Sequence, residues 1–325
     1  MIQIRGLIAP ALAIVASLLG ASTASAQAPL CYTLESLQGS YGTVSYFGDN
    51  IALGLASRYH DANGNFATAF VVNQPAAGST TGVRNLVTGT NKGSDTVNCD
   101  GSGVVSRTLT LSDGTTSQAF DDLLITEGTV QNGKLIATAV TDMQRIPSTI
   151  VPGGVFIIRK YTRRPDTRTA GCYTLASLQG SYGVQVYYGA NVALGLQAEI
   201  LDGKGNLTRT GLLNQPTAGS TTGARTIGPV TSTGTYTVNC DGSGTISRIV
   251  TRPDGTTATA LDDFLVTAGT EKDGQLTATT IFDAQRDPSV ILPGGVFVFR
   301  SHTLRPAQGT GPARSAPPGY RPPAR

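Results

Sequence analysis

An internal repeat constrains this chain more than any other feature. The segment TVNCDGSG occurs at Thr96–Gly103 and again at Thr237–Gly244, 141 residues further on. The flanking sequence repeats at the same offset without a gap, so that residues 31–165 align with residues 172–306. Solenoid repeats have periods of only about 20–50 residues, whereas each copy here is long enough for a complete domain. We therefore expect two homologous domains, at 31–165 and 172–306, joined by a linker at 166–171.

Both copies alternate short β-prone segments with turn residues. Asp-Gly and Asn-Gly pairs separate many segments, and such pairs favour the tight turns of β-hairpins. A helical pattern is confined to one turn, at Leu34–Gln38. The candidate strands of the first copy are Tyr41–Phe47, Ile51–His60, Asn65–Asn73, Val83–Val87, Ser94–Asn98, Val104–Leu111, Gln118–Thr126, Lys134–Thr141 and Val155–Tyr161.

This pattern predicts an all-β protein of two tandem, homologous antiparallel β-barrels of about eight strands each. Two β-sandwiches are the alternative. The barrel is favoured because closing a sheet removes its exposed edges.

The first 26 residues have the pattern of a secretory signal peptide. Arg5 precedes an apolar run at Leu7–Leu19, and Ala24-Ser25-Ala26 supplies a small-residue cleavage site. A membrane anchor is the alternative, but the run is short and Pro10 interrupts it. We expect an exported protein, periplasmic or extracellular, with no transmembrane segment in the mature chain.

Four cysteines fall as two equivalent pairs. Cys31 and Cys99 lie 68 residues apart, and so do Cys172 and Cys240. In an exported chain this pattern predicts one disulfide inside each domain. Closing such a loop stabilises a domain by about 4 kcal/mol in the chain-entropy model. A metal site is the alternative, but each domain offers two thiols and the copies share no histidine, so we predict none.

The net charge of +3 comes from the ends of the chain. Removing one arginine in the leader and three in the tail leaves residues 27–306 at −1. No basic surface is implied, so nucleic acid is not an expected partner. The Pro-, Gly- and Arg-rich tail at 307–325 is predicted to be disordered, either as a solvated tail or as a tether to the cell envelope.

No catalytic constellation recurs in the two copies. His60 aligns with Leu201, and His302 aligns with Tyr161, which excludes a histidine-dependent triad built the same way twice. The repeated pairs Asp121-Asp122 and Asp262-Asp263 are neighbours on strands, where adjacent side chains point to opposite faces. We therefore predict no catalytic residue and no cofactor.

Several repeated polar and aromatic residues are candidates for binding a ligand. An arginine on an apolar strand either reaches the rim or pairs inside with a carboxylate. Tyrosines supply amphipathic walls, although core packing is their commoner role. The candidates are Tyr41, Tyr46, Asp121, Arg145 and Arg159 in the first copy and Tyr182, Tyr187, Asp262, Arg286 and Arg300 in the second. The alternative for the charged members is a structural ion pair that closes the barrel.

A family resemblance rests on SLQGSYG, the Asp-x-x-Gly-Asn turn, NQPxAGSTTG, TVNCDGSG and PGGVF, which cover both repeats. Together they resemble a family of exported bacterial tandem-repeat β proteins of unassigned function. The order of strands and turns is also distantly similar to barrels of the allene oxide cyclase and dirigent type. That resemblance implies a cavity for an apolar or phenolic molecule, and none of those barrels' catalytic motifs matches residues of this chain.

Three functions follow from these features. The first is an exported two-barrel protein that binds a small apolar or aromatic ligand without catalysis. The second is a structural or adhesive protein of the envelope or matrix, and the third is an isomerase-like or cyclase-like enzyme. A loop at Asn73–Arg84, repeated at Asn214–Arg225, is a further candidate for binding.

Overall fold

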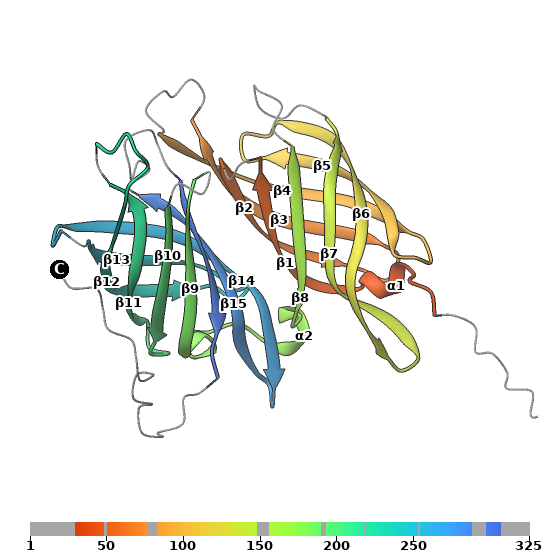
Figure 1. The fold of residues 1–325 in the computed structure, drawn as a ribbon. Coiled ribbons are helices and arrows are strands. Elements are labelled where there is room, and N and C mark those ends of the chain that lie inside the picture. The colour runs from red at the N-terminus through yellow and green to blue at the C-terminus, as the bar shows by residue number, and fades with distance from the viewer. Residues whose placement is uncertain are drawn as a thin grey trace, which may run out of the picture.

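The computed structural model describes residues 30–48, 51–76, 83–147, 156–189, 193–217, 219–252, 254–287 and 297–306. These residues form two closed antiparallel β-barrels of eight strands each, lying side by side (Figure 1). In each barrel every strand pairs with the next one in sequence, and the last strand pairs with the first. The predicted all-β fold of two tandem barrels is therefore confirmed.

The two barrels have matching strands. The first contains β1 (Gly39–Phe47), β2 (Ala52–His60), β3 (Asn65–Pro75), β4 (Arg84–Val97), β5 (Ser102–Leu111), β6 (Thr116–Gln131), β7 (Lys134–Ile146) and β8 (Ile157–Arg164). The second contains β9 (Gly180–Tyr188), β10 (Ala193–Leu201), β11 (Asn206–Pro216), β12 (Arg225–Val238), β13 (Ser243–Thr251), β14 (Thr257–Lys272), β15 (Gln275–Asp287) and β16 (Val298–Leu304).

The largest difference from the predicted strands is at β4. The segments Val83–Val87 and Ser94–Asn98, expected as two strands, belong to this one long strand. Gly89 and Gly93 lie between them and do not break it. Their missing side chains are required there, because a Cβ on Gly93 would lie 2.0 Å from the carbonyl oxygen of Ser106 on the neighbouring strand.

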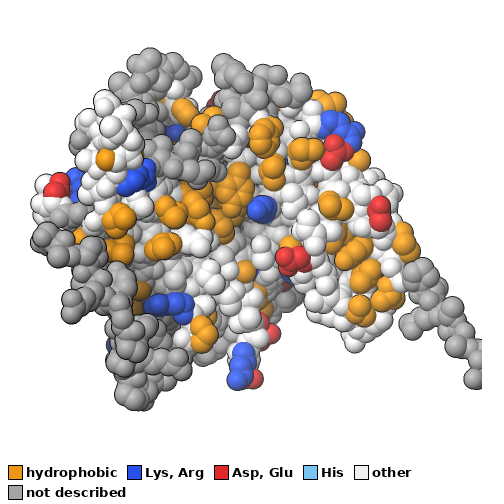
Figure 2. Space-filling model, viewed as in Figure 1, with side chains coloured by type: hydrophobic (Ala, Val, Ile, Leu, Met, Phe, Trp, Pro, Cys, Tyr) orange, Lys and Arg blue, Asp and Glu red, His pale blue; other side chains and the backbone are white. Residues whose placement is uncertain are grey.

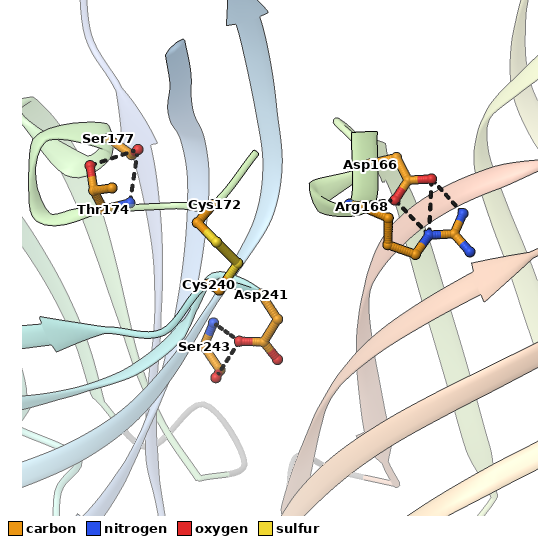
Figure 3. The surroundings of a disulfide bond; sticks show 8 residues. All are labelled: Asp166, Arg168, Cys172, Thr174, Ser177, Cys240, Asp241 and Ser243. Atoms are coloured by element: carbon orange, nitrogen blue, oxygen red, sulfur yellow. Dashed lines mark hydrogen bonds and ion pairs between the residues drawn. A yellow bond between two sulfur atoms is a disulfide. The ribbon is translucent and has the colours of Figure 1, made fainter. Parts of the chain in front are cut away.

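A short helical turn closes one end of each barrel. These turns are α1 (Leu34–Leu37) and the 3-10 turn η1 (Leu175–Leu178). Leu37 and Leu178 are buried among the apolar side chains at that end of their barrels. The linker forms one further turn, α2 (Thr167–Ala170), whose N-cap Asp166 accepts a hydrogen bond from the backbone of Arg168 (Figure 3).

A disulfide ties the start of each repeat to its own barrel. The bonds are Cys31–Cys99 and Cys172–Cys240, as predicted. Figure 3 shows the second bond beside the tight turn in which Asp241 accepts hydrogen bonds from the backbone and hydroxyl of Ser243. The disulfides indicate that the protein folds in a non-reducing environment.

Some predicted features lie outside the described residues. These are the signal peptide at 1–26, the tail at 307–325, the middle of the first candidate loop at 77–82, and the glycine-rich segments at 151–155 and 291–296. Among the residues that are described, no helix has the length and apolar character needed to cross a membrane.

Candidate functional site

The two barrels pack against each other through the outer surfaces of their sheets. Val44, Leu53 and Leu55 on β1 and β2 share one buried apolar cluster with Leu265 on β14 and Phe299 on β16. These outward side chains are apolar because the contact removes them from water, which stabilises it by roughly 25 cal/mol per Å² buried. The contact therefore fixes how the two barrels sit.

Two polar side chains of the first barrel complete this contact. Arg164 donates a hydrogen bond of 2.7 Å to the backbone oxygen of Val266. Asn73 donates a hydrogen bond, also of 2.7 Å, to the backbone oxygen of Gln285. Both donors are buried, and each bond satisfies a group that would otherwise be costly to remove from water.

A groove of about 400 Å³ runs along the junction between the barrels, and we call it the seam groove. Its volume lies within the range of small-molecule sites, about 300–1,000 Å³. Figure 2 shows hydrophobic side chains gathered where the barrels meet. The lining residues are Tyr46, Gly48, Phe156, Ile158 and Lys160 from the first barrel and Tyr187, Phe282, Phe299 and Ser301 from the second.

Aromatic rings dominate the groove. Tyr187 stacks on Phe299, with ring centroids 4.9 Å apart and planes 15° from parallel. Tyr46 meets the same Phe299 ring edge-on, at 6.2 Å. Burial, with a smaller contribution from Tyr187, raises the pKa of Tyr46 to about 12, so its hydroxyl stays protonated at neutral pH. The walls therefore present neutral rings and a phenolic hydroxyl.

One cation lies at the edge of these rings. The Nζ atom of Lys160 is 5.7 Å from the centroid of the Tyr46 ring, within reach of a cation–π interaction. Lys160 is exposed, and among the described residues no carboxylate forms an ion pair with it. A free ammonium group beside apolar walls can bind the anionic end of an aromatic molecule.

The inside of the first barrel holds a network of charges. Arg107 Nε donates to Asp121 Oδ2 at 2.7 Å, and Arg159 Nη1 donates to both Asp121 (3.0 Å) and Asp142 (2.9 Å). Gln144 accepts a hydrogen bond from each arginine. Burial opposes ionisation of Asp121, but Arg159 and Arg107 outweigh it and hold the carboxyl pKa below its usual value.

The second barrel contains the same network and extends it. Arg248, Asp262, Asp283, Gln285 and Arg300 repeat the five residues above with matching contacts.

The extension runs from Asp283 through His302. The Nε2 atom of His302 lies 2.8 Å from Asp283 and its Nδ1 atom lies 2.6 Å from Glu199, which also pairs with Arg209. Burial opposes the charge on His302, but Glu199 and Asp283 overcome it and raise the pKa of the imidazole.

These interior groups hold one another through hydrogen bonds and ion pairs. Both ring nitrogens of His302 are held by carboxylates, so neither is available to take a proton from a nucleophile. The side chains of Glu199, Asp283 and His302 are buried completely. Glu199, Asp283 and His302 each have an oppositely charged partner inside the barrel, as a buried ion network requires.

The structure separates the predicted site residues into four groups. Tyr46 and Tyr187 come together in the seam groove. The interior networks contain Asp121, Arg159, Asp262 and Arg300. On the outer surfaces Arg145 pairs with Asp122, and Arg286 with Asp263.

Arg145 therefore does not meet Asp121, because adjacent residues on β6 face opposite sides of the sheet. The last two candidates, Tyr41 and Tyr182, are buried in the barrel cores. Their hydroxyls donate to the backbone oxygens of Ala137 and Ala278.

Sequence reasoning missed most of the seam groove. It did not single out Phe156, Ile158, Lys160, Phe282, Phe299 or Ser301. Their outward positions could be read from strand alternation, but which outer faces meet depends on how the barrels dock. One sequence signal was present: Phe299 and Ser301 alternate with Arg300 and His302, so apolar and polar residues share one strand with a buried ion network.

The predicted absence of a metal site stays a prediction. Among the described residues, no group of three or more His, Cys, Asp or Glu side chains is arranged to hold a metal ion. In the Asp-x-x-Gly-Asn turn, the carboxylate of Asp61 accepts hydrogen bonds from the backbone N–H groups of Asn63 and Asn65, so it stabilises the turn itself.

Comparison with models of known protein families found no match, and a search of curated protein sequences found no relative. The site is therefore interpreted from its own geometry.

Proposed function

We propose that this protein binds a small aromatic or apolar molecule with an anionic group in the seam groove, without converting it. The observation that carries this is the combination of Tyr46, Tyr187 and Phe299 rings with the exposed cation of Lys160, which forms no ion pair among the described residues. Rings give contact area and stacking, while one ammonium group fixes the orientation of an anion. Phenolic and aromatic carboxylates have this chemistry.

The proposed site lies between the barrels rather than inside them. The resemblance to dirigent-type barrels implies the same class of ligand but a cavity within one barrel. Here the charged interior groups already hold one another, as the Arg159–Asp121 pair illustrates. The groove instead requires both repeats, which gives the tandem arrangement a role in binding.

We also propose that the protein acts outside the cytoplasm. The two disulfides support this, because such bonds persist in oxidising compartments. The signal-peptide pattern at residues 1–26 predicts export to the periplasm or the extracellular space. Small aromatic acids in those compartments are the expected ligands.

Calorimetric titration with 4-hydroxycinnamate tests the proposal. Lys160→Met should weaken binding about 10-fold, which corresponds to about 1.4 kcal/mol, because it removes one charge-assisted contact. The neutral amide of the same acid should bind both proteins equally. Lys92→Met is the matched control, since Lys92 is also an exposed lysine of the first barrel and lies outside the groove.

Two results would count against the seam groove as the site. The first is that this acid and a panel of related phenolic acids give no heat of binding in calorimetry and no added mass in native mass spectrometry. That result would show that the protein does not bind this class of ligand. The second is an equal loss of affinity in the Lys160 and Lys92 variants, which would show that the ligand does not bind in the seam groove.

A further inference from the structure

The contact between the barrels joins two different faces of the same fold. On the first barrel it uses outward residues of β1 to β3, namely Gly42, Val44, Leu53, Leu55 and Val71, which we call the front face. On the second barrel it uses outward residues of β14 to β16, namely Leu265, Thr267, Ala284, Phe297 and Phe299, which we call the back face. The contact is therefore front to back.

Because the fold is repeated, each barrel carries both faces, and one copy of each is left uncovered. Leu55 of the covered front face is 3% exposed, whereas its equivalent Leu196 on the second barrel is 59% exposed. Ala284 of the covered back face is 3% exposed, whereas its equivalent Met143 on the first barrel is 51% exposed. Leu194 and Leu212 extend the uncovered front face, and Leu124 and Phe156 extend the uncovered back face, where Phe156 also lines the seam groove.

We propose that these two uncovered faces bind each other between copies of this chain. The front face of the second barrel in one molecule would dock on the back face of the first barrel in the next. Such a contact is heterologous, so it repeats from molecule to molecule and yields a filament, or a ring if the rotation closes. The occupant of each face is thus a second copy of the chain.

The internal contact shows which interactions the new one would repeat. In the covered front face Leu55 lies directly across from Val71, and in the uncovered one Leu196 lies directly across from Leu212. Both pairs form an apolar ridge that is suited to burial against another apolar face. An exposed ridge of this kind on a soluble domain marks an interaction site.

The polar edge of the contact is repeated as well. The guanidinium of Arg84 stacks 4.2 Å above the Phe297 ring, across the junction. Their equivalents are Arg225, on the second barrel, and Phe156, on the exposed back face of the first. Docking of two copies would bring these two residues into the same arrangement.

A barrel can hold both neighbours at once. The internal contact involves β8, β1 and β2 of the first barrel, and the absent Cβ of Gly42 on β1 would lie 2.3 Å from the Cα of Thr267. The uncovered back face of that barrel is centred on β6 and β7, which follow β8 on the side of the closed sheet away from β1 and β2. The new contact is expected to be the weaker one, because Gln185 replaces Val44 and no linker joins the copies.

Sedimentation velocity of the mature protein over a range of concentrations tests the assembly. Sedimentation coefficients should rise with concentration for the wild type. Leu196→Arg blocks the front face and Met143→Arg blocks the back face, so each variant alone should remain monomeric. Ile249→Arg is the matched control, because Ile249 is 52% exposed on β13, away from both faces, and should assemble like the wild type.

Mixing the two blocked variants gives the decisive result. Leu196→Arg retains a free back face and Met143→Arg retains a free front face, so the mixture should form a one-to-one heterodimer. A wild type that is monomeric from micromolar to millimolar concentration would overturn the proposal. So would a blocked variant that dimerises alone, because that requires a front-to-front or back-to-back contact.

Discussion

The interiors of the two barrels share one set of charged and polar residues and differ in a second set. The shared set consists of Arg107, Asp121, Asp142, Gln144 and Arg159 and their equivalents Arg248, Asp262, Asp283, Gln285 and Arg300. The differing set contains Arg58, His60, Asp95 and Tyr161 in the first barrel, against Glu199, Leu201, Tyr236 and His302 in the second. The interior of each barrel nevertheless contains three buried arginines and three buried carboxylates; a fourth buried arginine of the first barrel, Arg164, lies at the contact between the barrels.

One cross-strand pair shows how the balance is kept. Arg58 lies across from Thr68 and donates to its hydroxyl, while at the same place Glu199 lies across from Arg209 and pairs with it. The charge is positive at Arg58 and negative at the equivalent Glu199, and the residue across from it changes from Thr68 to Arg209. Buried charges are costly when uncompensated, and the two interiors keep the same number of arginines and of carboxylates although individual residues differ.

The largest expected effect comes from breaking the shared set. Asp121→Asn leaves Arg107 and Arg159 short of one buried negative charge, which should cost the first barrel about 3–5 kcal/mol of its unfolding free energy. Asp262→Asn should cost the second barrel a similar amount. Denaturant titration, with hydrogen exchange to assign the loss to one barrel, measures both.

The control for this prediction is the adjacent aspartate. Asp122→Asn makes the same chemical change on the outer face, where Asp122 pairs with the exposed Arg145. Exposed pairs contribute about 0–1 kcal/mol, so this variant should be almost as stable as the wild type. Similar losses for Asp121→Asn and Asp122→Asn would mean that the interior network does not set the stability of the barrel.

The next effect concerns the outer faces, where the barrels differ because only one front face is covered. A Cβ on Gly42 would lie 2.3 Å from the Cα of Thr267, whereas a Cβ on the equivalent Gly183 would meet only the Arg305 side chain at 3.7 Å. Gly42→Ala should therefore weaken the internal contact by about 1–3 kcal/mol, the usual cost of overpacking.

Gly183→Ala should leave the monomer unchanged and weaken only the proposed assembly. Small-angle scattering and thermal unfolding of the two variants measure the difference. Equal effects of the two substitutions on the monomer would show that the barrels do not dock at Gly42.

The sequence allowed most of the fold to be predicted, because the repeat, the Asp-Gly and Asn-Gly turns and the cysteine spacing are local signals. Asn132-Gly133 illustrates this: both residues have positive φ, 49° and 76°, in the hairpin that the pair predicted. The opposite orientations of Asp121 and Asp122 also followed from strand alternation.

The candidate site was harder to predict for a physical reason. Lys160 and Phe299 lie on strands of different barrels, and nothing local indicates that they line one groove. Docking depends on the shape and exposure of whole faces, and because the two repeats are homologous, each face occurs twice and either copy could form the contact. The close approach of Gly42 to Thr267 shows which copy of the front face is used in the contact.

The smallest expected effect is an opposite response of the two barrels to pH. Burial lowers the pKa of His60 below its ordinary value of about 6.5, despite Asp95. The stability that depends on neutral His60 is present above about pH 6.5 and is lost as the pH falls. The pKa of His302 is raised instead, because Glu199 and Asp283 outweigh its burial. The stability that depends on protonated His302 is present below about pH 6.5 and is lost as the pH rises through the raised pKa of the folded state.

Between pH 6 and pH 8 the first barrel should therefore become more stable and the second less stable. One proton can change the unfolding free energy by at most about 1.4 kcal/mol per pH unit. Hydrogen-exchange mass spectrometry, corrected for the intrinsic effect of pH on exchange, resolves the two barrels within one chain.

Exchanging the residues between repeats isolates the cause. His60→Leu introduces the residue found at the equivalent Leu201, and it should abolish the rise in the stability of the first barrel between pH 6 and pH 8. His302→Tyr introduces the residue found at Tyr161, whose hydroxyl contacts Asp142 as His302 contacts Asp283, and should abolish the fall in the second barrel. Barrels that shift in the same direction, in the wild type and in both variants, would show that other groups control their response to pH.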